Sequence, residues 1–153
     1  MSALAYRTAL GSYAYRYAVG FDGFTPDGPM DSAAFLRAAH ELGFAGVQLC
    51  ENLHFDGLSD ADLDDLKRLA HELGLFVEVG MKEMNASSLR RHIDLATRLG
   101  SRLVRVVLGD DYSWQRADTD RERAIAVLRD ALPICHARDL TIGLENRFDL
   151  YST

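Results

Sequence analysis

Hydrophobic positions follow the same pattern in four segments of the chain. Each segment combines an amphipathic helix, a short stop and a strand rich in Val, Leu and Ile. The segments are AAHELGFAGVQLC, LAHELGLFVEVGM, ATRLGSRLVRVVLG and CHARDLTIGLEN. Within the predicted helices, apolar residues recur at helical spacing. For example, Leu63, Leu66, Ala70 and Leu73 form one apolar stripe, with charged residues on the opposite face.

The ends of these helices are marked by local chemistry. Gly43, Gly74 and Gly100 follow the last helical turn, where glycine closes a helix without a Cβ penalty, whereas the fourth segment has Arg138-Asp139 instead. Helix starts are predicted at the N-cap residue types Asp31, Ser59 and Asn85, and Ser59 with Asp62 resembles a capping box. Pro133 is expected to kink or divide a helix spanning about 119–138.

The order of elements predicts a parallel α/β fold. With LGSYAYRYAV as the first strand, strands and helices alternate, which requires crossover connections and a parallel sheet covered by helices. No glycine-rich phosphate loop follows any strand, which argues against a nucleotide-binding doubly wound sheet. An eight-unit barrel takes about 250 residues, so five units need roughly 156. We therefore predict one domain over 1–153, a partial (β/α)8 TIM barrel of about five parallel strands.

In each predicted strand one face is mostly apolar, and the other face carries one polar or charged residue. These residues are Arg16, Gln48, Glu78, Arg105 and Glu145. We expect all five to face away from the helices, which in a barrel means the interior and its C-terminal mouth. Glu78 and Arg105 have an alternative interpretation as a structural ion pair inside the barrel. The alternative interpretation of Gln48 and Arg16 is that they are packing or hydrogen-bonding residues. Glu145 is followed by Asn146 and Arg147 at the point where the strand becomes a loop. The C-terminal ends of barrel strands hold the catalytic residues of this architecture, so Glu145 is a candidate catalytic residue.

Composition narrows the function classes. The formal net charge of −6 and the lack of Lys/Arg runs argue against a nucleic-acid or membrane surface. Cys50 and Cys135 have no metal-type spacing and are expected to be free thiols. No signal-peptide or membrane-span pattern is present, so we expect a cytoplasmic protein.

The predicted loops after the strands supply further candidates. Glu51 and His54 stand three residues apart, but neighbouring Asn52 and Gly57 indicate a loop, so a solvated histidine is the alternative to a binding residue. Trp114, with Tyr112, offers a wall for a sugar-sized pocket or a packed loop. Neither a cysteine–histidine pair nor a G-x-S-x-G turn supports acyl transfer. Glu145 remains as a candidate metal ligand or general base.

Four stretches together resemble the sugar phosphate isomerase/epimerase family, the xylose-isomerase-like TIM barrels. They are LGSYAYRYAVG, AAHELGFAGVQL, LAHELGLFVEVGM and GLEN at 143–146, and only the N-terminal five β/α units are represented. The resemblance implies a metal-dependent isomerase or epimerase that transfers a proton through an enediolate. It also implies a sugar or related polyol as the substrate. A homo-oligomer is a separate possibility, because the last strand would otherwise leave an open edge of unpaired backbone groups.

The resemblance assigns roles to individual residues. Glu145 matches the family's first ligand of a divalent ion, Mn²⁺ or Mg²⁺ in the first place and Zn²⁺ or Co²⁺ as alternatives, and it would also act in catalysis. Asn146 would support that carboxylate. Their places on predicted strands and loops, independently of the resemblance, make Arg105, Asn146, Arg147, Trp114 and His54 candidate substrate-binding residues. Arg147 stands where many members have His, which leaves its role open between no function and contact with an anionic group.

The family's other metal ligands come from strands that these 153 residues lack. We therefore expect this chain to be a fragment, and to be inactive and prone to self-association by itself. Three alternatives stay open: an abasic-site endonuclease-like barrel, disfavoured by the negative charge; a polyol dehydratase, which shares the first chemical step; and a non-catalytic half-barrel module.

Overall fold

A computed structural model describes residues 7–21, 23–108 and 117–145 of the chain. Within these residues, five strands form one sheet in the order β1-β2-β3-β4-β5, and the pairs β1–β2, β3–β4 and β4–β5 are parallel. The partial TIM-barrel architecture predicted from the sequence is thereby confirmed. The chain divides into two compact units, residues 1–78 and 79–153, which are described in turn.

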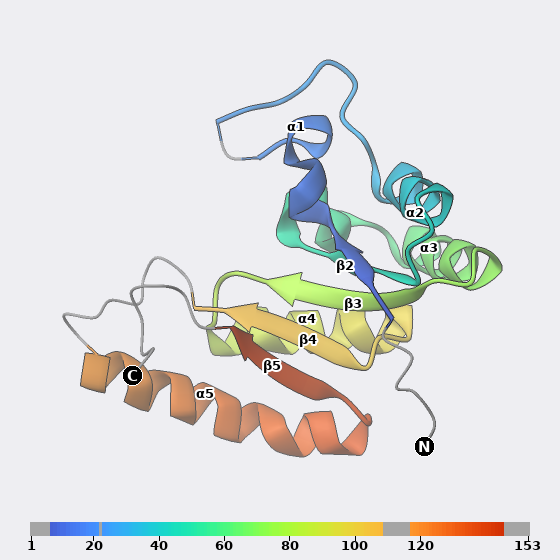
Figure 1. Cartoon of the computed structure of the whole chain (residues 1–153). Coiled ribbons are helices and arrows are strands. Elements are labelled where there is room, and N and C mark those ends of the chain that lie inside the picture. The colour runs from blue at the N-terminus through green and yellow to red at the C-terminus, as the bar shows by residue number, and fades with distance from the viewer. Residues whose placement is uncertain (1–6, 22, 109–116, 146–153) are drawn as a thin grey trace, which may run out of the picture. The chain divides into compact units, whose positions relative to one another are not determined.

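The first unit contains β1 (Ala9–Gly11), η1 (Ser12–Tyr15), α1 (Arg16–Val19), α2 (Ser32–Glu41), β2 (Gly46–Leu49), η2 (Glu51–Leu53), η3 (Phe55–Gly57) and α3 (Asp60–Glu72). It also holds the first half of β3 (Phe76–Met81). Helix α2 packs against α3 and β2 (Figure 1). Phe35, Leu36, Val47, Leu49 and Phe55 are fully buried and form its core.

The prediction of a long first strand was wrong. Strand β1 ends at Gly11, so Arg16 lies in the short helix α1 and not on a strand face. The ladder stops because the Ser12 hydroxyl, rather than a backbone carbonyl, accepts the hydrogen bond from the Cys50 amide at 3.1 Å. From Ser12 onward the backbone turns into the 3₁₀-helix η1.

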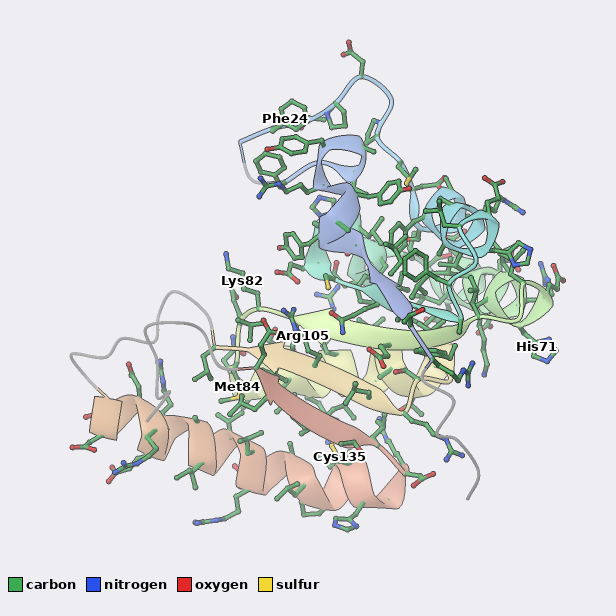
Figure 2. All side chains as sticks on the ribbon, viewed as in Figure 1. Phe24, His71, Lys82, Met84, Arg105 and Cys135 are labelled. Atoms are coloured by element: carbon green, nitrogen blue, oxygen red, sulfur yellow. The ribbon has the colours of Figure 1, made fainter. Side chains whose placement is uncertain are left out.

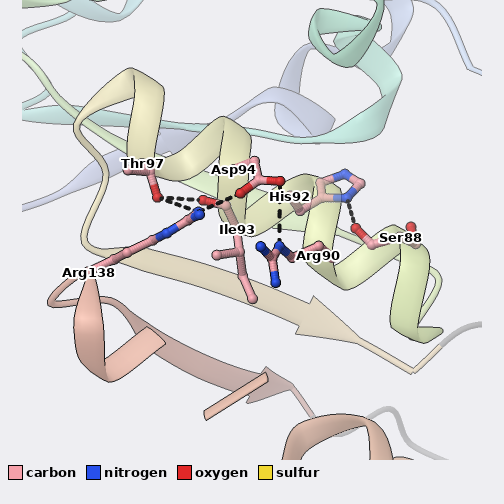
Figure 3. Close-up of polar contacts among 7 residues, drawn as sticks. All are labelled: Ser88, Arg90, His92, Ile93, Asp94, Thr97 and Arg138. Carbon is pink, nitrogen blue, oxygen red and sulfur yellow. Dashed lines mark hydrogen bonds and ion pairs between the residues drawn. The ribbon is translucent and has the colours of Figure 1, made fainter. Parts of the chain in front are cut away.

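The second unit contains the end of β3, α4 (Ala86–Leu99), β4 (Leu103–Val107), α5 (Ala117–Ala137) and β5 (Thr141–Glu145). Helix α4 packs against β4 and α5, and α5 packs against β5 (Figure 1). Arg138, which follows α5, contacts Asp94 and donates to the Thr97 hydroxyl at 3.3 Å, both on α4 (Figure 3). These contacts tie the end of α5, and hence the start of β5, to α4.

The predicted helix boundaries are confirmed. Asp31, Ser59 and Asn85 are N-caps whose side chains accept backbone amides, and Ser59 with Asp62 forms a capping box. Gly43, Gly74 and Gly100 have positive φ. In the fourth segment Asp139 takes the left-handed conformation, with φ 52°, that glycine supplies elsewhere.

The expected division of the last helix at Pro133 was wrong, because α5 continues through it to Ala137. Pro133 lies on the exposed side of the helix. Water can therefore satisfy the carbonyl that loses its amide partner there, which reduces the cost of the break.

Candidate functional site

Glu145 and Arg105 are joined in the second unit, where β4 and β5 run side by side. The Nε of Arg105 donates to Oε2 of Glu145 at 2.6 Å. The Arg105 side chain is 22% exposed and that of Glu145 is 50% exposed. In β4, Arg105 alternates with the fully buried Val104 and Val106 (Figure 2). It therefore lies on the face of the strand opposite to the apolar one, as the strand pattern predicted.

The donor chemistry of Glu145 suits one ligand of a hard divalent cation. Within the described residues its Oε2 carries the contact with Arg105, which leaves Oε1 as the oxygen that a cation can approach. A carboxylate oxygen is a ligand that Mg²⁺ and Mn²⁺ prefer. Within the described ranges, no group of three or more His, Cys, Asp or Glu side chains is arranged to hold a metal ion. Glu145 thus fits as one member of a larger ligand set.

A second polar cluster follows β1 and β2 in the first unit. The Ser12 hydroxyl, which is fully buried, donates to Oδ1 of Asn52 at 2.6 Å, and Nδ2 of Asn52 donates to the Ser12 carbonyl at 3.3 Å. Together with the Cys50 amide, these bonds fix the two loops to one another. Sequence analysis missed this cluster, because its partners are about 40 residues apart and neither belongs to a recognisable motif.

Glu51 stands beside this cluster, at the start of η2. Its Oε1 accepts a hydrogen bond from the Tyr13 hydroxyl at 2.8 Å. Its Oε2 is buried, and no donor among the described residues bonds to it. A buried carboxylate oxygen without a donor is rare and costs stability.

The other interior polar residues of the first unit also have partners there. The amide of Gln48 donates to Oε2 of Glu78 at 3.1 Å, and the Cys50 thiol lies 3.7 Å from the Gln48 carbonyl oxygen. Gln48 and Glu78 are therefore held in a hydrogen-bonded chain along the sheet face.

The structure locates some of the other predicted site residues. His54 is exposed and left-handed, with φ 49°, between η2 and η3, so it shares no regular helix with Glu51. Trp114, Asn146 and Arg147 lie outside the described residues, and their predicted roles stay predictions.

Both cysteines are buried free thiols, as expected. Burial raises the pKa of the Cys135 thiol, an effect that the nearby Arg138 guanidinium partly opposes. A thiol that is harder to ionise is a poorer nucleophile. Cys135, on α5 (Figure 2), is thus a packing residue.

The sequence matches a known protein family. The model of the xylose isomerase-like TIM barrel family matches residues 36–150. The chain belongs to this family. A curated relative, 3-oxo-isoapionate decarboxylase from Pectobacterium atrosepticum, is 28% identical to this chain over 117 residues. The match covers 76% of this chain and 41% of that protein.

Solved structures share the fold of this xylose isomerase-like chain. A D-psicose 3-epimerase crystallised in the presence of D-fructose matches with a TM-score of 0.72 at 13% identity, over 94% of this chain and 54% of that one. The D-psicose 3-epimerase of Clostridium cellulolyticum H10 with D-tagatose gives 0.69 at 19% identity, with the same coverage. A probable 3-DHS dehydratase from Bacillus anthracis gives 0.60 at 15% identity over 95% of this chain and 54% of that one.

The chain therefore spans less than half of the curated relative and about half of each solved structure. In the part that the structure describes, no helix has the length and apolar character needed to cross a membrane.

Proposed function

We propose that this chain carries part of the active site of a metal-dependent sugar isomerase or epimerase, with Glu145 as a ligand of Mn²⁺ or Mg²⁺. The observation that carries the proposal is the placement of Glu145. It is a half-exposed carboxylate at the C-terminal end of β5, held through one oxygen by Arg105. In TIM barrels the C-terminal ends of the strands are where catalytic residues gather.

The reaction removes a proton from a carbon next to a carbonyl group and returns it, through an enediolate form of the substrate. A bound divalent cation supplies Lewis-acid polarisation of the substrate's carbonyl and hydroxyl oxygens. Glu145 would hold the cation through Oε1, the oxygen that is outside the contact with Arg105. Carboxylates are suitable proton acceptors when they are positioned within hydrogen-bonding distance.

A ketose or related polyol is the proposed substrate class. Its support is the fold similarity to two D-psicose 3-epimerases whose structures were determined with D-fructose or D-tagatose. The sequence-predicted contacts to this substrate are Arg105, His54, Trp114, Asn146 and Arg147.

The curated relative favours a second candidate, the decarboxylation of a 3-oxo sugar acid. Loss of CO₂ from such an acid leaves an enolate, whose negative charge needs the same stabilisation as an enediolate. The two candidates differ in product, since one releases CO₂ and the other exchanges a carbon-bound proton with solvent. Incubation in D₂O with ketoses, and CO₂ detection with 3-oxo acids, separates them.

Glu145→Gln tests the metal assignment directly in a protein that also carries the remaining strands of the barrel, because the described residues hold no complete ligand set. The amide keeps the size of the side chain but loses the charge, so we expect Mn²⁺ binding to be lost in titration calorimetry. Turnover is expected to fall by a factor of at least about 10². Glu122→Gln makes the same change at an exposed position on α5 and should leave Mn²⁺ binding and turnover unchanged. Unaltered Mn²⁺ binding in Glu145→Gln would refute the assignment.

A further inference from the structure

The contact between Arg105 and Glu145 is built into the register of β4 and β5. Arg105 is paired with Gly143, and Glu145 with Val107, so the two charged residues are diagonal neighbours on the same face of the sheet. Long side chains span such diagonals. The residue directly across from Arg105 has no side chain, so nothing from Gly143 stands between the guanidinium and the carboxylate.

The same register explains why this position is a glycine. A Cβ on Gly143 would lie 3.3 Å from Cδ1 of Leu103, which is already a tight contact. A larger residue there would crowd Leu103 further, so this position favours glycine.

The atoms involved determine what the contact does. Arg105 donates from Nε to Oε2 at 2.6 Å, which restricts the rotation of the carboxylate and leaves Oε1 outside this contact. Arg105 is mostly buried, so its own position is set by packing, whereas Glu145 is half exposed at the end of the last strand. Groups that hydrogen-bond a ligating carboxylate orient it, and their loss weakens metal binding.

We propose that Arg105 is a positioning residue that holds Glu145 in its metal-binding orientation and stays bonded to it when the cation is bound. This inference rests on the proposed role of Glu145. It gives Arg105 a function other than the substrate contact predicted from the sequence. The positive charge of Arg105 suggests a competing role. In that role Arg105 repels the cation, and its bond to Glu145 breaks when the cation binds.

Metal affinity distinguishes the two roles. In Arg105→Met the stem is kept and the donor is lost, and we expect the dissociation constant for Mn²⁺, measured by electron paramagnetic resonance of the free ion, to rise by about 10- to 100-fold. Arg105→Lys should recover part of this loss, because an ammonium group can still bond Oε2. The matched control is Arg102→Met, since Arg102 forms an exposed ion pair with Asp139 at the opposite end of the same strand pair. That variant should bind Mn²⁺ like the wild type.

A second measurement needs no substitution of Arg105. The Nε–H signal of Arg105 in ¹H–¹⁵N spectra should differ between the wild type and Glu145→Gln, and saturating Mg²⁺ should leave the wild-type signal at its Glu145-bonded position. A signal that moves to the Glu145→Gln position on adding Mg²⁺ would overturn the inference, as would a Met variant with unchanged or tighter Mn²⁺ binding. If Arg105→Met binds normally while Glu145→Gln does not, the positioning role alone fails. If the wild-type protein with all strands of the barrel does not bind Mn²⁺, both proposals fail.

Discussion

Two glutamates near the C-terminal ends of strands, Glu145 in β5 and Glu51 after β2, differ in how their charge is satisfied. Glu145 has a guanidinium at 2.6 Å, whereas Glu51 has the neutral Tyr13 hydroxyl at 2.8 Å on one oxygen. The other oxygen of Glu51 is buried without a donor among the described residues. An ionised oxygen in that position costs more than a neutral group of the same shape. Glu51 is therefore a local source of instability in the first unit.

Glu51→Gln is expected to stabilise the protein. The amide carbonyl still accepts from Tyr13, and the buried charge is removed, so the free energy of unfolding in urea should rise by about 1 kcal/mol. Glu41→Gln, at an exposed position on α2, serves as the control and should change the free energy of unfolding by less than about 0.5 kcal/mol. A destabilised Glu51→Gln protein would show that the charge has a partner in solution.

Individual site residues were predictable only where strand periodicity exposes them. Arg105 and Glu145 interrupt apolar strands at alternate positions, so their shared face followed from the sequence. The Tyr13–Glu51 contact joins residues 38 apart, so no local sequence pattern pairs them. The sequence drew attention to His54 instead, which the structure leaves exposed.

At the scale of elements, local chemistry was a good guide to where helices begin and end. Caps, capping boxes and left-handed glycines depend on neighbouring residues, so the sequence contains the whole interaction. The first strand was mispredicted because its end depends on a hydrogen bond between Ser12 and Cys50, which are far apart in sequence. Alternation of apolar residues in LGSYAYRYAV carries no sign of that bond.

Close packing between β2 and β3 in the first unit gives a prediction about an element. A Cβ on Gly46 would lie 2.6 Å from three ring carbons of Phe76, and the Arg7 guanidinium lies 4.5 Å from the ring centre. Gly46→Ala should therefore force the ring to move and lower the free energy of unfolding by about 1–3 kcal/mol. Denaturation in urea measures the change.

The control for this experiment is Gly11→Ala in β1, because a Cβ there meets no atom within 4 Å. It should cost less than about 0.5 kcal/mol. Equal losses in the two variants would mean that strand glycines are destabilised by substitution in general and that the Phe76 contact is not the cause.

At the scale of the whole molecule, the order of strands and helices was predictable because crossover connections leave few alternatives. The family match and the solved structures confirm the barrel type and show that the chain spans about half of those relatives. The remaining metal ligands were not predictable from these residues. Glu145 can supply one ligand of the proposed metal site, and the described residues contain no group of three or more His, Cys, Asp or Glu side chains that would complete it.

The strand order leads to a last prediction, which concerns association. Strand β5 is at one end of the order and pairs with β4, so within the described residues its other edge has no strand beside it. Such an edge presents unpaired amide and carbonyl groups to other chains. We expect the weight-average mass of the 153-residue chain to rise with concentration in sedimentation equilibrium.

Thr141→Lys tests whether this edge is responsible. Thr141 is exposed at the start of β5, and a lysine there places a charge on the edge that another strand must approach, so association should weaken. Thr119→Lys introduces the same charge at an exposed position on α5 and should leave association unchanged. If both variants reduce association equally, net charge rather than the strand edge controls it. A wild-type chain that stays monomeric at all concentrations would show that the edge does not drive association.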